Sequence, residues 1–274
     1  MKNALVRTIS GVCFLGIMLA GLLINEYTFA SLFILMMGGM LWEFYRMTMG
    51  SHYILERVFA VCTAVYFFCS VFLFVTQGIS IKYIGLSILP LTVIMILSLY
   101  VKNKEDFGLF SNLYAGLLYI GMPLALANFV VFRGGSYSGL LMLSFFIIIW
   151  ASDVGAYTFG MLFGRNGKKL FPSISPKKSW AGFWGGLGTA VAAAVVMYFT
   201  GMIGFPLVHC IALAVIMNVA GVYGDLFESQ WKRVCGIKDS GDLIPGHGGL
   251  LDRFDSAIFA IPVGVIYLTV FNLL

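Results

Sequence analysis

The stretch 138–163, SGLLMLSFFIIIWASDVGAYTFGMLF, decides the fold class of this chain. It is a continuous apolar run that holds a single charged residue, Asp153. A helix of about 20 apolar residues is long enough to cross the roughly 30 Å of hydrocarbon in a bilayer. Barrel strands would instead alternate polar and apolar residues over about ten positions. The run therefore predicts a membrane-spanning helix with one carboxylate inside it.

The rest of the chain has the same character. Its residues are 60% hydrophobic and only 11% charged, whereas about a quarter of the residues of soluble domains are charged. We expect an all-α, polytopic integral membrane protein with about nine transmembrane helices. The expected spans are 6–24, 28–47, 57–77, 82–100, 109–132, 138–163, 181–200, 205–228 and 254–274.

The distribution of basic residues predicts the orientation. With the N-terminus in the cytoplasm, only Lys82 and Arg133 of the 17 Lys and Arg residues fall on the outer side. This asymmetry accounts for the net charge of +5 without a nucleic-acid partner, and no nucleic-acid-binding motif is present. The chain is expected to be a multi-pass protein of the cell membrane, the inner one where a cell has two, with its polar loops on the cytoplasmic side.

Polar chemistry is concentrated in the second half of the chain. We expect one membrane domain, 1–274, in which residues 1–132 form a packing and lipid-facing half and residues 138–274 form the working half. The five cysteines lack CxxC spacing and mostly lie inside apolar runs, so they indicate reduced packing residues.

The end of the eighth span carries four polar side chains on one helical face. Asp225, Glu228, Ser229 and Lys232 are spaced i, i+3, i+4 and i+7. A charged group inside a span costs about 2.5–3.5 kcal/mol on insertion scales, so it is a functional candidate. The alternative is a helix end that emerges into water with ordinary i,i+4 partners.

The segment 234–251 is rich in glycine, and Asp252 and Asp255 follow it at the start of the last span. Glycine lets the backbone approach a ligand closely, and the N–H groups of a helix start favour anions. Acidic oxygens facing a polyphosphate need a divalent cation, and Mg²⁺ is typically held by one or two carboxylates plus phosphate oxygens. Basic residues of the same region would neutralise the remaining phosphate charge: Lys232, Arg233, Lys238 and Arg253.

Three further features allow more than one interpretation. The loop 164–180, with Lys177 and Lys178, either handles phosphate or is an ordinary cytoplasmic loop rich in positive charge. His247 lies among glycines, where it can contact phosphate or act as an acid or base. Glu43 lies one turn from Arg46 and is interpreted as half of an interfacial ion pair.

These residues form a recognisable pattern. The positions Ser229-x-x-Lys232-Arg233-x4-Lys238-Asp239-x-Gly241-x3-Pro245-Gly246-His247-Gly248-Gly249-x-x-Asp252-Arg253-x-Asp255 closely resemble the signature of phosphatidate cytidylyltransferases, also called CDP-diacylglycerol synthases. Asp153-Val-Gly-Ala-Tyr157 and Ser175-Pro-Lys-Lys-Ser-Trp180 resemble upstream motifs of that family. The resemblance covers roughly the C-terminal half. It implies a nine-helix membrane nucleotidyltransferase of phospholipid biosynthesis that joins CTP to phosphatidic acid, giving CDP-diacylglycerol and pyrophosphate.

The resemblance also implies roles for individual residues. Asp225 and Asp252 are expected to hold Mg²⁺, with a second, monovalent cation such as K⁺ allowed, and to act in catalysis with Lys238 and His247. The expected substrate-binding residues are Asp153, Lys177, Lys178, Ser229, Lys232, Arg233, Asp239, Arg253 and Asp255. The partners are CTP, phosphatidic acid and membrane lipid, and a homodimer stays open.

Two departures and three competing functions remain. Trp231 replaces a smaller apolar residue, and Ala181 stands where the family usually has Glu, so we expect this alanine to reduce activity.

A CTP-dependent polyprenol or phytol kinase would use an alcohol in place of the phosphate acceptor. An ion-coupled transporter would bury acids but turn over no CTP. A CDP-alcohol phosphotransferase is disfavoured because its DGxxAR…GxxxD…D pattern is absent.

Overall fold

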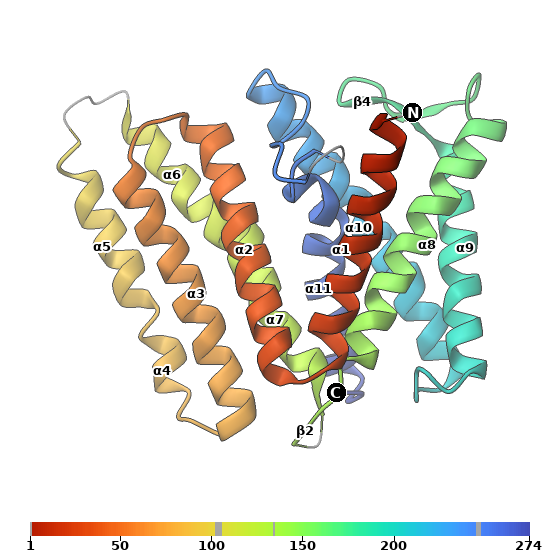
Figure 1. Ribbon diagram of the computed structural model, residues 1–274, viewed down its shortest axis with the longest axis horizontal. Helices are drawn as coiled ribbons and strands as arrows, with labels where there is room; N and C mark the ends of the chain where they lie inside the picture. Colours follow the sequence, from red (N-terminus) through yellow and green to blue (C-terminus); the bar gives the residue numbers. More distant parts are fainter. Residues whose placement is uncertain (1, 102–105, 134, 245–247) are drawn as a thin grey trace. The chain divides into compact units, whose positions relative to one another are not determined.

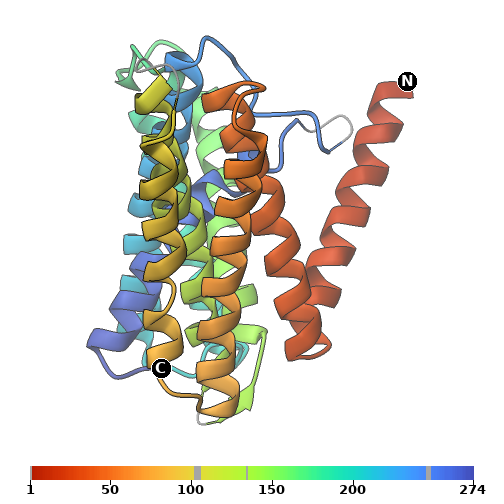
Figure 2. The same cartoon turned by 90° about the vertical axis from the view of Figure 1, so that its left-hand side faces the viewer.

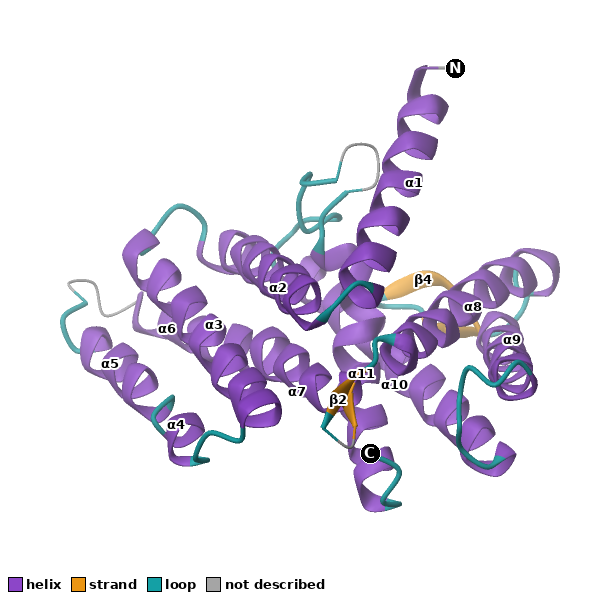
Figure 3. Cartoon of the chain, turned by 60° about the horizontal axis from the view of Figure 1, so that its bottom comes forward, coloured by secondary structure: helices purple, strands orange, loops and turns teal. Residues whose placement is uncertain are grey.

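The computed structural model describes residues 2–101, 106–133, 135–244 and 248–274, with backbone alone for residues 2–7. The described residues are predominantly helical (Figures 1 and 3), which confirms the all-α prediction. Two short antiparallel hairpins interrupt the helices. The first pairs β1 (Phe132–Arg133) with β2 (Ser136–Tyr137), and the second pairs β3 (Lys169–Phe171) with β4 (Ser175–Ser179).

Seven helical stretches of the described chain are long and apolar enough to span a membrane. Each overlaps an expected span and agrees with its ends to within about four residues, except that α10 ends six residues later than expected. They are α2 (Glu26–Met49), α3 (Ile54–Gln77), the stretch Phe107–Val131, α8 (Leu140–Phe163), α9 (Trp180–Phe199), α10 (Leu207–Val234) and α11 (Leu251–Val270).

The first and fourth expected spans coincide with shorter apolar helices. The described part of α1 (Lys2–Leu23) that carries apolar character is Thr8–Leu23, and Lys82–Ser98 contains α4 (Lys82–Gly85) and α5 (Ile88–Ser98). The multi-pass character is therefore confirmed, while the count of nine spans stays a prediction.

The chain divides into two compact units. The first unit comprises Met1–Tyr137 and Asp239–Arg253, and the second comprises Ser138–Lys238 and Phe254–Leu274. The division after residue 137 lies close to the expected border between the two halves. The segment Asp239–Arg253 belongs to the first unit, although it lies in the C-terminal half of the sequence. That the whole chain acts as one domain stays a prediction.

In the first unit, α2 is packed against α1, α3 and α6 (Phe107–Gly116). Its buried Tyr45 donates a hydrogen bond of 2.9 Å to the carbonyl of Leu113, and a Cβ on Gly116 would lie 2.5 Å from the Tyr45 ring. A π-helical turn, Leu117–Gly121, joins α6 to α7 (Met122–Val131). Figure 2 shows α1 diverging from α2 toward the N-terminus.

In the second unit, α8 and α9 lie side by side (Figure 1) because small residues line their contact. A Cβ on Gly186 would lie 2.9 Å from the carbonyl oxygen of Ser152, and one on Gly182 would lie 2.8 Å from that of Ala156. Thr189 of α9 donates a hydrogen bond of 2.8 Å to the carbonyl of Ala151. Small side chains that let backbones meet and hydroxyls that bond across helices are the usual means of association in a membrane.

Candidate active site

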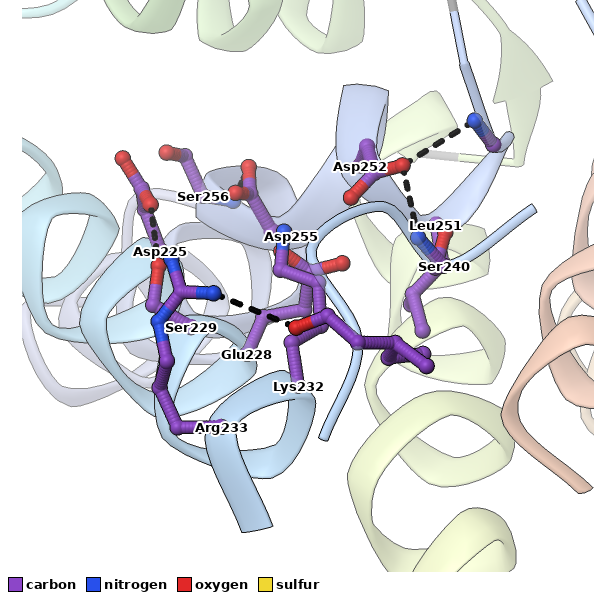
Figure 4. A network of polar contacts seen from close by, with 12 residues as sticks. Asp225, Glu228, Ser229, Lys232, Arg233, Ser240, Leu251, Asp252, Asp255 and Ser256 are labelled. Carbon is purple, nitrogen blue, oxygen red and sulfur yellow. Dashed lines mark hydrogen bonds and ion pairs between the residues drawn. The ribbon is translucent and has the colours of Figure 1, made fainter. Parts of the chain in front are cut away.

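The polar stripe of α10 has the expected arrangement (Figure 4). Ser229 Oγ donates to Asp225 Oδ1 at 3.3 Å, and Lys232 Nζ donates to Glu228 Oε2 at 2.6 Å. Both pairs join residues four positions apart, so the four side chains share one helical face as the spacing predicts.

The Glu228–Lys232 pair is removed from water. The Glu228 side chain is fully buried, and 11% of the Lys232 side chain is exposed. Removing one partner of a buried ion pair costs about 3–5 kcal/mol, because the remaining charge is left without compensation. In this state the ammonium of Lys232 neutralises Glu228, and its binding of phosphate stays a prediction.

Asp225 receives a cation from the second hairpin, where Lys178 of β4 forms an ion pair with Asp225 Oδ2. The hairpin is fixed at both ends. Lys169 of β3 donates to the carbonyl of Gly164 at 2.8 Å, and Ser179 caps α9 by accepting the N–H of Gly182 at 3.2 Å. The loop 164–180 therefore does more than follow the positive-inside rule, because it delivers an ammonium group to the α10 stripe. Lys177 is exposed on the same strand.

The first turns of α11 bring a further carboxylate to α10. The helices meet at Gly224, where a Cβ would lie 2.5 Å from the carbonyl oxygen of Asp255. Asp255 lies within electrostatic range of Asp225, Glu228 and Asp153. Its Oδ1 accepts the N–H of Ser256 at 2.6 Å. The second unit thus gathers four carboxylates of the predicted site.

This donor set is suited to a hard divalent cation. Carboxylates outnumber the ammonium groups of Lys178 and Lys232 around Asp255, and Mg²⁺ prefers such oxygen ligands. Within the described residues, no three His, Cys, Asp or Glu side chains converge as a preformed metal site. Mg²⁺ usually keeps waters and binds through one or two carboxylates plus phosphate oxygens, so these carboxylates fit an ion whose other ligands are water and phosphate.

Asp252 joins the two described parts of the segment 239–253, residues 239–244 and 248–253, which we call the motif loop. Its Oδ2 accepts the backbone N–H groups of Ser240 and Gly249, each at 3.0 Å (Figure 4). Gly248 has φ +87°, a conformation that side chains disfavour, and its carbonyl accepts the N–H of Ile244 at 3.0 Å. Gly248 and Gly249 therefore let the described backbone come close to Asp252.

Glu43 corrects an expectation. No ion pair joins it to the exposed Arg46 within the part of the chain that the structure describes. Glu43 is only 4% exposed, and its carboxylate accepts hydrogen bonds from the motif loop. The ion pair with Arg46 that the i,i+3 spacing suggested is therefore wrong. A carboxylate inside an apolar span was the signal that could have revealed this role.

Four of the other predicted residues are exposed. Arg233 is exposed and donates to the carbonyl of Ile237 at 3.1 Å, where it supports the chain after α10. Lys238, Asp239 and Arg253 are exposed, and His247 lies outside the described residues. Asp225 and Asp252 belong to different units, so their meeting in space stays a prediction.

Comparison with known sequences places this arrangement in a family. A sequence model described as "Cytidylyltransferase family" matches residues 5–271. The chain belongs to the cytidylyltransferase family. That membership accounts for the acids and bases of α10 and β4, and separately for those of the motif loop, in an otherwise apolar chain.

Individual relatives agree with the family match. A protein of Staphylococcus haemolyticus named phosphatidate cytidylyltransferase is 37% identical over 172 residues, which cover 62% of this chain and 64% of that protein. A protein of Bacillus subtilis with the same name is 34% identical over 200 residues, covering 73% and 72% of the two chains. The chain thus spans just under two thirds of the staphylococcal relative.

Proposed function

We propose that this protein transfers the cytidylyl group of CTP to phosphatidic acid, giving CDP-diacylglycerol and pyrophosphate. The observation that carries the proposal is the α10 stripe, in which Lys178 meets Asp225 and Lys232 meets Glu228 beside Asp255. Family membership and the names of the relatives support the same reaction.

The reaction needs positioning and charge neutralisation more than covalent chemistry. A phosphate oxygen of phosphatidic acid attacks the α-phosphorus of CTP, a new P–O bond forms, and the bond to the β-phosphate oxygen breaks with release of pyrophosphate. Cationic side chains near the stripe and the motif loop would hold the phosphates: Lys177, Lys178, Lys232, Arg233, Lys238 and Arg253. His247 stays a candidate for proton transfer at the phosphates.

Mg²⁺ is part of the proposal, held by Asp225 and Asp252, with Asp255 as a further candidate ligand. When bound, the ion would supply Lewis-acid stabilisation of the charge on the phosphates. A second, monovalent cation such as K⁺ is compatible with this many acids. Lys178 forms an ion pair with Asp225 in this structure. When a nucleotide binds, the Lys178 ammonium would leave this carboxylate and pair with a phosphate.

The site is proposed to face the cytoplasm. The segments 164–180 and 229–253 carry nine of the chain's 17 Lys and Arg residues, which favour the cytoplasmic side. CTP, the proposed nucleotide substrate, is made there. The acceptor lipid would reach the site laterally from the membrane.

The test is purified protein in detergent with Mg²⁺, labelled CTP and phosphatidic acid. We expect labelled CDP-diacylglycerol together with one pyrophosphate for each product molecule. Asp225→Asn and Asp252→Asn should each remove most activity, and the double variant should be little worse, because groups that act as one unit are not additive. Asp242→Asn, which removes an exposed carboxylate of the same loop, is the matched control and should keep near-normal turnover.

Two outcomes would refute the proposal. Phosphorylation of a polyprenol or phytol with release of CDP, and no product from phosphatidic acid, would make the protein a lipid kinase. Near-normal turnover in either aspartate variant, with its thermal stability intact, would remove these carboxylates from the site.

A further inference from the structure

Glu43 lies in α2, about two hundred residues before the motif loop, yet it makes three hydrogen bonds to that loop. Its Oε1 accepts the N–H of Leu250 at 3.0 Å. Its Oε2 accepts the N–H of Leu251 at 2.8 Å and the hydroxyl of Ser240 at 3.2 Å. All these residues belong to the first unit, so the contacts lie within one compact body.

The face of α2 around Glu43 is shaped to receive the loop. A Cβ on Gly241 would lie 2.5 Å from Glu43 Oε1, and a Cβ on Gly249 would lie 2.7 Å from Oε2. One turn earlier on the same face, a Cβ on Gly39 would lie 2.8 Å from Leu250 Cδ2. The absence of side chains at these three glycines lets the loop close on the carboxylate.

The contacts of Glu43 continue into those of Asp252. Ser240 donates its hydroxyl to Glu43 and its backbone N–H to Asp252 Oδ2. The consecutive N–H groups of Gly249, Leu250 and Leu251 end on these two carboxylates, the first on Asp252 and the other two on Glu43. Glu43 and Asp252 thus accept hydrogen bonds from the same serine and from the same three-residue backbone segment. A change in the hydrogen bonds of one carboxylate therefore alters the hydrogen-bond geometry of the other.

We propose that Glu43 is a positioning residue for cytidylyl transfer: its carboxylate fixes the motif loop and, through Ser240 and Gly249, orients Asp252. The consequence for catalysis rests on the proposed function, whereas the link between the two carboxylates rests on the hydrogen bonds alone. A simple helix cap would act only on the N–H groups of Leu250 and Leu251, where α11 begins.

Charge and acceptor capacity make Glu43→Gln the informative change. The side chain keeps its size, but its amide NH₂ can only donate, so in either orientation it faces at least one N–H or O–H donor of the loop. Losing a hydrogen bond to a charged acceptor should lower the rate roughly 10- to 100-fold where the bond is felt in the transition state.

The experiment measures residue-resolved hydrogen exchange and steady-state kinetics on the full chain in detergent. In Glu43→Gln we expect faster exchange at Leu250 and Leu251, and also at Ser240 and Gly249, whose N–H groups bond to Asp252. We expect kcat/KM for CTP to fall roughly 10- to 100-fold. The matched control is Tyr45→Phe, which removes a buried hydrogen bond of α2 that points to Leu113, and it should leave both readouts unchanged even if the melting temperature falls.

Each other outcome overturns the inference. Unchanged hydrogen exchange at Ser240 and Gly249 would show that Glu43 acts only as a helix cap. A kcat/KM within twofold of the parent value would show that Glu43 does not contribute to catalysis. If Glu43→Gln does not fold, Ser240→Ala removes one hydrogen-bond donor to Glu43 while the sequence of α2 stays unchanged. It should speed exchange at Gly249 and lower kcat/KM in the same direction, and no effect would overturn the proposal. If the parent protein makes no CDP-diacylglycerol, the proposed function fails, but the exchange data still judge the link between Glu43 and Asp252.

Discussion

Adding one methyl group where α10 meets α11 should disable the enzyme. A Cβ at Gly224 would lie 2.5 Å from the carbonyl oxygen of Asp255 and 3.1 Å from Phe259 Cβ. Ordinary contacts of carbon atoms lie near 3.5 Å, so the helices must separate by about 1 Å. Overpacking of this kind costs about 1–3 kcal/mol, and a displacement of about 1 Å at reacting groups can cost about 100-fold in rate.

Gly221 provides the matched control, one turn earlier on the same helix. A Cβ there would lie 3.4 Å from Ser256 Cβ, an ordinary contact. We expect Gly221→Ala to keep near-parental turnover, while Gly224→Ala lowers kcat roughly 100-fold and reduces the melting temperature. The assay is CDP-diacylglycerol formation at saturating Mg²⁺, with a thermal melt in detergent. Parental turnover in Gly224→Ala, or equal losses in both variants, would refute the argument that this close approach sets the site.

Three further outcomes are expected. Ala181→Glu should raise turnover, because the resembled family usually has Glu at this position. It should also stabilise α9, because the helix dipole favours an acid in the first turn of a helix. An Ala181→Glu variant that is no faster than the parent would contradict the first expectation. In a chain without other cysteines, Ser173→Cys and Asp242→Cys should resist an impermeant thiol reagent in intact cells and react after lysis, and labelling from outside would invert the topology. Burial raises the pKa of Cys235 above its ordinary value, so less thiolate is present at a given pH, and its alkylation rate should reach half of its plateau at a higher pH than that of a solvent-exposed thiol.

Hydrophobic length and helical spacing predicted most of the architecture. Long apolar runs located seven spans, although α10 continues six residues beyond its expected end, and the i, i+3, i+4, i+7 pattern placed Asp225 and Lys232 on one face. The run 82–100 was harder, because the helix breaks between Gly85 and Ile88, and apolar composition alone carries no signal for such a break.

Contacts between residues distant in sequence could not be predicted in the same way. Spacing says which residues share a helix face, but it cannot say that Lys178 reaches Asp225, because that depends on the hairpin that carries it. Glu43 illustrates the same limit. Its nearest basic residue in the sequence is Arg46, whereas its actual partners begin at Ser240.

The ion pairs of α10 have a consequence for how the chain is made. The ribosome delivers the chain from its N-terminus, so Lys178 has already emerged when Asp225 reaches the insertion machinery. Glu228 finds its cation four residues later on the same helix, a partner that is available as soon as that turn winds. An unneutralised acid would make this segment costly to release into lipid. Assembly of α10 therefore needs no later part of the protein to balance these two charges, so it can enter the bilayer before α11 has been synthesised.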